Sequence, residues 1–396
     1  MDCASPLCGD LNSQKAKPMN IGVDLRCLQT KNRTGVGEYA FQLLKAIFEI
    51  DNKNNYYLFF NTSSKEFQPP TFNKPNVFQV RFKYPNIFFN FSSLFFSAPK
   101  IDLLLKKHFK FEKIDYFFSP NLNFTSLSKE VKHILTIHDL TFELLPHFIT
   151  LKQRLWHFLL RAKNQCQKAF QITTPSENTK RDIIYNYGIE ANKIKSIFLG
   201  LPTHKENNGL DSDNDLAKDL PENYLLYLGT LEPRKNIISI IKAFESVAPT
   251  LKIKYELVIA GAPGWKYKSI LQSLKNSPLK NQIRLLGYIN EGSKNILYKN
   301  AKLFIYPSFY EGFGLPVLEA MHFGVPVITS NRSSLSELAD GSCHLVNPHR
   351  PEEIALGMER ILNDVNYAES LRIKGKNRAQ NFSWQNAAIK WLELLK

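Results

Sequence analysis

Short apolar runs alternate along the chain with longer stretches in which apolar residues recur every three or four positions. The runs indicate buried strands, and the spaced pattern indicates amphipathic helices. Strands are expected at residues 20–24, 56–60, 114–118, 132–137, 171–175, 194–197, 224–228, 256–260, 283–287, 303–306 and 325–328. Helices are expected at residues 40–50, 151–168, 237–247, 334–338, 351–362 and 368–379, with Ser176 and Ser383 as caps of two more. This alternation predicts an α/β protein with doubly wound parallel sheets.

The chain has 396 residues, which is long enough for two domains of ordinary size. Its composition turns polar after residue 201 and becomes apolar again at Tyr224. A polar stretch between two sets of strands is typical of a linker. The expected divisions are a disordered tail at 1–18, a first domain at 19–203, a linker at 204–221, a second domain at 222–380 and a closing helix at 381–396.

The most informative stretch, residues 303–330, predicts a strand, a glycine loop, a helix and a second strand. Pro316 suits the start of the helix, and Gly324 suits the position just past its end. The free N–H groups and the positive dipole end of such a helix favour a phosphate.

Two carboxylates, Glu311 and Glu319, bracket this loop in the pattern E-G-F-G-L-P followed by E. Carboxylates are poor phosphate ligands but strong acceptors for sugar hydroxyl groups. A loop with donors for phosphate and acceptors for hydroxyls suits a nucleotide-sugar. The alternative is a plain helix start, at which the acids only compensate the helix dipole and the glycines only form a turn.

This motif resembles the E-x7-E motif of the family-4 (GT4-type) retaining glycosyltransferases. The resemblance implies a GT-B fold, in which two Rossmann-like domains face each other across a cleft. It also implies that Glu311 lies near the donor sugar, that Glu319 binds the ribose, and that the closing helix crosses back to the first domain. The loop residues implied to lie at the donor are Gly312, Phe313, Gly314 and Leu315.

Two features of the first half resemble the same family. Residues 32–39 combine Gly35 and Gly37 in a glycine loop before the first helix, which would lie across the cleft from the E-x7-E loop. A bare structural turn is the alternative. His138 follows a buried strand, and ligands collect outside the carboxyl ends of such strands. The resemblance implies that His138 approaches the donor sugar.

In the second half, Gly229 and Thr230 follow the first strand and precede Arg234 and Lys235. Two cations at a strand-to-helix turn can neutralise a diphosphate leaving group. Many family members carry Arg where this chain has Thr230. By the same resemblance, Gly261 belongs to a loop at the donor, and Tyr288 flanks the base.

The chain carries a formal charge of +15 and a pI near 9.4, which favour anionic partners. Residues 76–110 combine many Phe residues with Lys100, Lys106, Lys107 and Lys110, a composition that suits an anionic membrane surface. The alternative places the Phe residues in the core. Five scattered cysteines show no metal-binding spacing and favour a reduced, cytoplasmic location. We expect a cytoplasmic protein that is peripheral to the membrane face.

The resemblance implies transfer of a hexose from a nucleotide-diphosphate sugar to a hydroxyl of a saccharide or lipid-linked acceptor, with retention and without an essential metal. I-G-V-D-x-R and G-T-L-E-P-R-K-N look like bacterial mannosyltransferases of surface polysaccharide assembly, which favours GDP-mannose over a UDP-sugar. A GT-B epimerase or phosphorylase stays an alternative. A nucleic-acid binder would fit the charge, but the chain has no motif of that class, so no nucleic-acid partner is expected.

Overall fold

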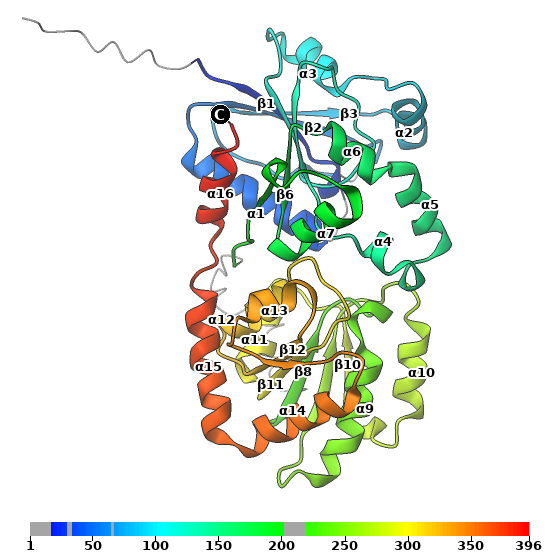
Figure 1. The fold of residues 1–396 in the computed structure, drawn as a ribbon, viewed down its shortest axis with the longest axis vertical. Helices are drawn as coiled ribbons and strands as arrows, with labels where there is room; N and C mark the ends of the chain where they lie inside the picture. Colours follow the sequence, from blue (N-terminus) through cyan, green and yellow to red (C-terminus); the bar gives the residue numbers. More distant parts are fainter. Residues whose placement is uncertain (1–16, 30–33, 65–66, 202–218, 396) are drawn as a thin grey trace, which may run out of the picture.

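The computed structural model describes residues 17–29, 34–64, 67–201 and 219–395. Within these residues, two parallel sheets lie one above the other along the long axis of the molecule (Figure 1). The seven-stranded sheet has the order β3-β2-β1-β4-β5-β6-β7, and the six-stranded sheet has the order β10-β9-β8-β11-β12-β13. In both sheets the strand order reverses beside the first strand, between β1 and β4 and between β8 and β11. Ligands of doubly wound sheets bind outside the carboxyl ends of the strands at such points.

The strands of the first sheet are β1 (Asn20–Asp24), β2 (Asn55–Asn61), β3 (Val77–Phe82), β4 (Tyr116–Ser119), β5 (Lys132–Thr136), β6 (Gln171–Thr174) and β7 (Ile194–Ser196). Those of the second are β8 (Tyr224–Leu228), β9 (Glu256–Ala260), β10 (Ile283–Gly287), β11 (Leu303–Tyr306), β12 (Val327–Ser330) and β13 (His344–Val346). All of their pairings are parallel.

Helices connect the strands and cover both sheets (Figure 1). In the first half they are α1 (Gly35–Ile50), α2 (Asn86–Phe95), α3 (Ile101–Phe109), α4 (Thr141–Leu144), α5 (Leu151–Leu160), α6 (Ala162–Lys168) and α7 (Glu177–Tyr187). In the second they are α9 (Ile237–Val247), α10 (Lys268–Asn276), α11 (Glu291–Asn300), α12 (Leu315–His322), α13 (Ser333–Ala339), α14 (Pro351–Asn363), α15 (Val365–Ala379) and α16 (Trp384–Leu392). Short 3-10 turns include η2 (Pro146–Phe148) and η4 (Pro233–Lys235).

The central strand β8 and the helix α9 show why the second half folds as it does. All five residues of β8 are buried, because helices cover both faces of the parallel sheet. In α9, Ile237, Ile240, Ile241 and Phe244 recur every three or four residues and are all buried. Burial of each such side chain contributes about 1.5–3 kcal/mol.

The end of the chain connects the two halves. Figure 1 shows α15 and α16 in red along one side of the molecule, the first beside the lower half and the second beside the upper half. Helix α16 packs against α1, and Trp391 lies with its ring 4.8 Å from the ring of Phe118 in β4. The last helix therefore belongs structurally to the half in which the chain begins.

The predicted parallel sheets are confirmed, and several local differences remain. The strands β3 and β13 were not predicted. The predicted helix at 151–168 is broken into α5 and α6 by Arg161, which has a φ of 49°. The strand predicted at 325–328 begins two residues later, because Gly324 turns the chain with a φ of 70°. Most of the predicted tail and linker lies in residues 1–16 and 202–218, outside the described residues.

Candidate functional site

The loop after β11 carries the carboxylate at the centre of the site. Glu311 is buried, and one oxygen of its carboxylate accepts a hydrogen bond from Lys235 Nζ at 2.6 Å. The other oxygen accepts from Arg234 Nη1 at 2.8 Å. The turn η4 supplies both cations, because it follows β8, which is the neighbour of β11 in the sheet.

A second buried carboxylate, that of Glu232, completes a carboxylate–cation cluster with Arg234, Lys235 and Glu311. Glu232 accepts from Arg234 Nε at 3.1 Å and from Arg234 Nη2 at 2.7 Å. Arg234 also donates to the carbonyl of Tyr310 at 2.7 Å. The two predicted phosphate-binding cations are therefore already engaged by carboxylates, which the sequence did not indicate.

Burial and charge act in opposite directions on these four groups. Burial opposes ionisation of Glu311, but Arg234 and Lys235 outweigh it and lower its pKa to about 2. Burial raises the pKa of Glu232, although Arg234 and Lys235 oppose that shift. Burial and the neighbouring Arg234 lower the pKa of Lys235. Glu311 is thus the stronger acid of the two carboxylic acids.

The glycine loop leads directly into helix α12. Gly314 precedes the helix with a φ of 108°, a conformation that favours glycine, and Leu315 and Pro316 form its first positions. The backbone N–H groups of this turn lie at the positive end of the helix dipole, which suits a phosphate. The ring of Phe313 does not point toward this position but packs on Phe382, at a centroid distance of 5.8 Å.

Glu319, the second carboxylate of the motif, lies in α12 and is buried. It accepts a hydrogen bond from the hydroxyl of Tyr298 at 2.9 Å, and Lys294 Nζ lies 4.0 Å from it. The carboxylate is therefore held by helix α11.

His138 approaches the loop from the other half of the molecule. It follows β5, and a side chain at Gly312 would place its Cβ 2.1 Å from the carbonyl oxygen of His138. The ring lies edge-on to Tyr39 at 4.7 Å, and Nε2 lies 2.8 Å from the carbonyl oxygen of Pro120. Burial lowers the pKa of His138 and favours the neutral imidazole. The structure therefore brings His138 and the loop of Glu311 together.

Two glycines hold neighbouring strand ends of the second sheet close together. A Cβ on Gly261, which has a φ of 148°, would lie 1.9 Å from the carbonyl oxygen of Gly229. Thr230 is exposed beside them, and Tyr288 is 60% exposed. The side chains of Thr230 and Tyr288 are therefore exposed, whereas those of the carboxylate–cation cluster are enclosed.

The prediction of a glycine loop at residues 32–39 is wrong in part, because the helix already begins at Gly35. Gly35 and Gly37 lie in the first turn of α1, whose N-terminus Thr34 caps by accepting from the N–H of Gly37. Glycine is favoured at position 37, because a Cβ there would lie only 3.3 Å from the carbonyl oxygen of Cys27. Residues 30–33 lie outside the described residues.

Several contacts across the two halves escaped the sequence reasoning, and three of them involve helix α7. Tyr310 donates to Asp182 of α7 at 2.6 Å. The carboxylate of Glu337 in α13 accepts from the N–H groups of Glu177 and Asn178 at the start of α7, each at 3.0 Å. No sequence period connects residues that lie more than 100 positions apart, so a local pattern could not reveal them.

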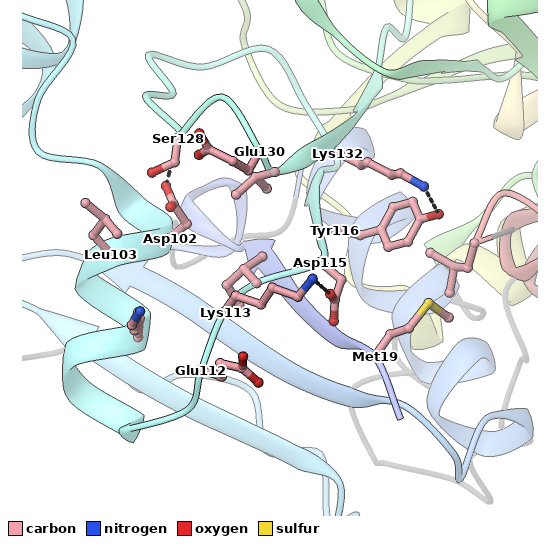
Figure 2. Close-up of a pocket in the computed structure, with 14 residues that line it drawn as sticks. Met19, Asp102, Leu103, Glu112, Lys113, Asp115, Tyr116, Ser128, Glu130 and Lys132 are labelled. Atoms are coloured by element: carbon pink, nitrogen blue, oxygen red, sulfur yellow. Dashed lines mark hydrogen bonds and ion pairs between the residues drawn. The ribbon is translucent and has the colours of Figure 1, made fainter. Parts of the chain in front are cut away.

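A cavity of about 560 Å³ lies elsewhere, at the opposite edge of the first sheet (Figure 2). Met19, Tyr116 and Lys132 line it where β1, β4 and β5 begin, whereas His138 lies where β5 ends. Figure 2 shows Lys132 pointing toward Tyr116, and Lys113 pointing toward Asp115. This cavity is distinct from the place where His138 meets the Glu311 loop.

Two family models match the chain on either side of the predicted linker. The one described as Glycosyltransferase Family 4 matches residues 33–205, and the one described as Glycosyl transferases group 1 matches residues 211–378. The O-antigen chain mannosyltransferase B of Escherichia coli is 26% identical over 372 residues, which are 92% of this chain and 96% of that protein. The serotype-specific mannosyltransferase WbdA of Escherichia coli is 34% identical over 171 residues, which are 43% of this chain and 21% of that protein.

Solved structures share the fold. The sucrose-phosphate synthase of Thermosynechococcus elongatus matches with a TM-score of 0.72 at 18% identity, covering 95% of this chain and 98% of that one. HepE of Anabaena, in complex with UDP and glucose, matches with a TM-score of 0.68 at 18% identity, covering 95% of this chain and 99% of that one. The expected GT-B fold is confirmed. Because the two models together span almost all of residues 33–378, the chain belongs to the GT4-type glycosyltransferases and is a hexosyltransferase of that class.

Proposed function

We propose that the protein transfers a mannosyl group from a nucleotide-diphosphate sugar to a hydroxyl of a saccharide or lipid-linked acceptor, with retention at the anomeric carbon. One observation carries the proposal: the loop of Glu311 leads into a helix N-terminus suited to phosphate and lies against the backbone of His138 of the other half. The names of the two Escherichia coli relatives, both mannosyltransferases, support mannose as the sugar.

The geometry assigns roles to this chain's own residues. The N–H groups before α12 would bind the diphosphate, and Glu319 would receive the ribose hydroxyls. Glu311 and the neutral His138 would orient the sugar, because an ionised carboxylate accepts strong hydrogen bonds from hydroxyl groups. Lys235 and the helix dipole would stabilise the charge that develops on the departing diphosphate. No side chain is assigned as a covalent nucleophile.

We propose GDP-mannose as the donor, with a UDP-sugar as the alternative. The relatives support mannose, whereas the HepE structure contains UDP and glucose. A ligand that binds only the folded state raises its apparent stability, so a thermal-shift series with GDP-mannose and UDP-glucose separates the two donors. Stabilisation by UDP-glucose alone would overturn the choice of GDP-mannose.

Analysis of the product tests the reaction itself. Incubation with the stabilising donor and a lipid-linked saccharide should give a new glycoside with the anomeric configuration of the donor. Release of an epimerised free sugar would indicate an epimerase instead. A sugar phosphate formed from a glycoside and phosphate would indicate a phosphorylase.

We also propose that transfer needs no essential metal ion, because Lys235 and the α12 N-terminus supply positive charge at the diphosphate. Within residues 17–29, 34–64, 67–201 and 219–395, no three His, Cys, Asp or Glu side chains form a metal-holding group. The test is a chelator assay, given in the Discussion.

Helix α2 presents the surface that we propose contacts the membrane. Phe88 is 73% exposed, and Ile87, Phe91 and Phe95 are exposed on the same helix, whereas Phe89 is buried. The interpretation of this Phe-rich stretch as core therefore fails for most of α2. No helix in the described part of the chain has the length and apolar character needed to span a membrane. We propose peripheral attachment at the cytoplasmic face, with anionic lipid rather than nucleic acid as the partner of the positive charge.

The charges of α3, the helix that follows α2 in the chain, define the test. Lys106, Lys107 and Lys110 are exposed in and after α3. Lys100 differs from them, because it donates to the carbonyl of Leu127 at 2.8 Å and so supports the local backbone. Three lysines near an anionic surface contribute about 1 kcal/mol each, or roughly a hundredfold in binding together.

Changing Lys106, Lys107 and Lys110 to Gln should therefore weaken co-sedimentation with anionic vesicles by about a hundredfold at low salt. The matched control changes three exposed lysines of the other half, Lys252, Lys254 and Lys299, to Gln. Equal loss of vesicle binding in both triple variants would show that only the net charge of the protein matters. No loss of binding in the first variant would show that α3 does not contact the membrane. Binding of donor should be unchanged in both.

A further inference from the structure

Glu232 holds an unusual position in the site. It is 2% exposed, and its carboxylate engages two nitrogens of Arg234, so it fixes the guanidinium that in turn contacts Glu311. The family resemblance assigns it no role. It lies two residues beyond Thr230, the position where many family members carry an additional Arg.

The charges of the carboxylate–cation cluster cancel one another. Two carboxylates, Glu232 and Glu311, face two cations, Arg234 and Lys235, and all four side chains are largely enclosed. The nucleotide-sugar brings a diphosphate that is doubly negative. An uncompensated charge in an enclosed site is costly, and Lys235 alone cannot balance two negative charges while the cluster as a whole has no net charge. The dipole of α12 supplies only about half of one charge.

We propose that Glu232 takes up one proton when the nucleotide-sugar binds, which changes the cluster from neutral to singly positive. This inference rests on the proposed function. In this step, a hydronium ion or buffer acid is the proton donor: its bond to the proton breaks, one Glu232 oxygen forms an O–H bond, and the conjugate base stays in solution. The carbonyl oxygen of the resulting acid still accepts from Arg234. Glu232 is thus a positioning residue that adjusts charge.

The surrounding groups indicate why Glu232, and not Glu311, is protonated. Arg234 and Lys235 both contact Glu311 and keep its pKa near 2, whereas burial raises that of Glu232. The phenols of Tyr227 and Tyr306 also face the cluster, and burial raises the pKa of both, so they stay neutral. Asp139, beyond β5, acts on Arg234 from the other half. It adds negative charge and so does not replace the missing cation.

Calorimetry of the wild-type protein measures the proton directly. GDP-mannose and UDP-glucose are suitable probes, because their phosphate esters stay ionised at neutral pH. Titration at about pH 7.5 in two buffers with different ionisation enthalpies should show net proton uptake on binding, and affinity should fall as pH rises. Binding without proton uptake, at an affinity independent of pH, would overturn the proposal. Absence of binding by either probe would overturn the proposed function together with it.

The variant Glu232→Gln keeps the shape of the side chain and removes its negative charge. We expect it to bind the same probe about tenfold more tightly than wild type at about pH 8, without proton uptake or pH dependence. A purely structural role predicts weaker binding instead, and that result would overturn the proposal. Glu256→Gln, which breaks the Glu256–Arg284 pair at the start of β9, is the control and should match wild type. If Glu232→Gln does not fold, the wild-type calorimetry still decides.

Discussion

Substitution of Glu311 by Gln is expected to destabilise the fold as well as to abolish transfer. The carboxylate lies within 2.8 Å of both cationic side chains and is buried, so its loss leaves Arg234 and Lys235 with one counter-charge fewer. Its pKa is about 2 instead of the ordinary 4.5. At about 1.4 kcal/mol for each pKa unit, the ionised carboxylate contributes about 3–4 kcal/mol to the free energy of unfolding. Breaking a buried pair by removing one partner typically costs about 3–5 kcal/mol.

The sign of the pH dependence follows from the lowered pKa. A carboxyl group whose pKa is lower in the folded state stabilises the protein at every pH above its ordinary pKa. The contribution of Glu311 should therefore be complete at pH 7 and should disappear as pH falls from 4.5 to about 2. Glu311→Gln should lack this part of the acid transition.

Urea unfolding at neutral pH, followed by circular dichroism, measures the difference. Glu256→Gln is the matched control, because its partly exposed pair with Arg284 should contribute less than about 1 kcal/mol. Adding Lys235→Met to Glu311→Gln should restore part of the lost stability, since it removes a stranded cation. A Glu311→Gln variant within about 0.5 kcal/mol of wild type would refute this account of the cluster. It would indicate instead that the loop of Glu311 tolerates substitution without loss of stability.

Three further outcomes are expected. EDTA should leave the transfer rate unchanged, and a loss that Mg²⁺ or Mn²⁺ restores would contradict the metal-free proposal. Gly261→Ala should lower the free energy of unfolding by more than about 3 kcal/mol, because the new Cβ would overlap the carbonyl of Gly229. The control is Gly341→Ala, where φ is 77° and no atom lies within 4 Å of the new Cβ. It should cost about 1 kcal/mol in the same unfolding assay. Glu337→Ala removes the acceptor that links α13 to α7, so kcat/KM should fall about tenfold and X-ray scattering should show a larger radius of gyration.

Most of the central strands could be predicted from the sequence, because their burial on both faces leaves a continuous apolar run. The predicted bounds of the central strands β1, β8, β9 and β11 agree with the structure, and so do those of β10, an edge strand with no fully buried residue. The two strands that escaped prediction lie at the edges of the sheets. In β3 only Val80 is buried, so exposure on both sides removes the signal. The strand β13 has only three residues.

The site could be predicted less completely, and the reason is physical. The E-x7-E motif located Glu311 and Glu319, since residues close in sequence report local geometry. Whether Arg234 is free or paired depends on β8 lying beside β11, which brings together residues 77 positions apart. The sequence shows the charges of Glu232 and Arg234 but not that both are buried, and burial determines their chemistry.

Three consecutive residues connect this chemistry to the relative position of the two halves. Tyr310 donates to Asp182 of the first half, Glu311 binds the cations of the second half, and Gly312 touches the backbone of His138 in the first half again. Any movement that separates α7 from α13 must therefore pull on both neighbours of Glu311 while Arg234 and Lys235 hold its carboxylate. Since the sugar would lie between Glu311 and His138, the two can orient it together only when Tyr310 and Gly312 make these contacts. Contact between the halves and the position of the Glu311 loop are thus coupled, and the coupling depends on glycine at position 312, where a Cβ would overlap the carbonyl of His138.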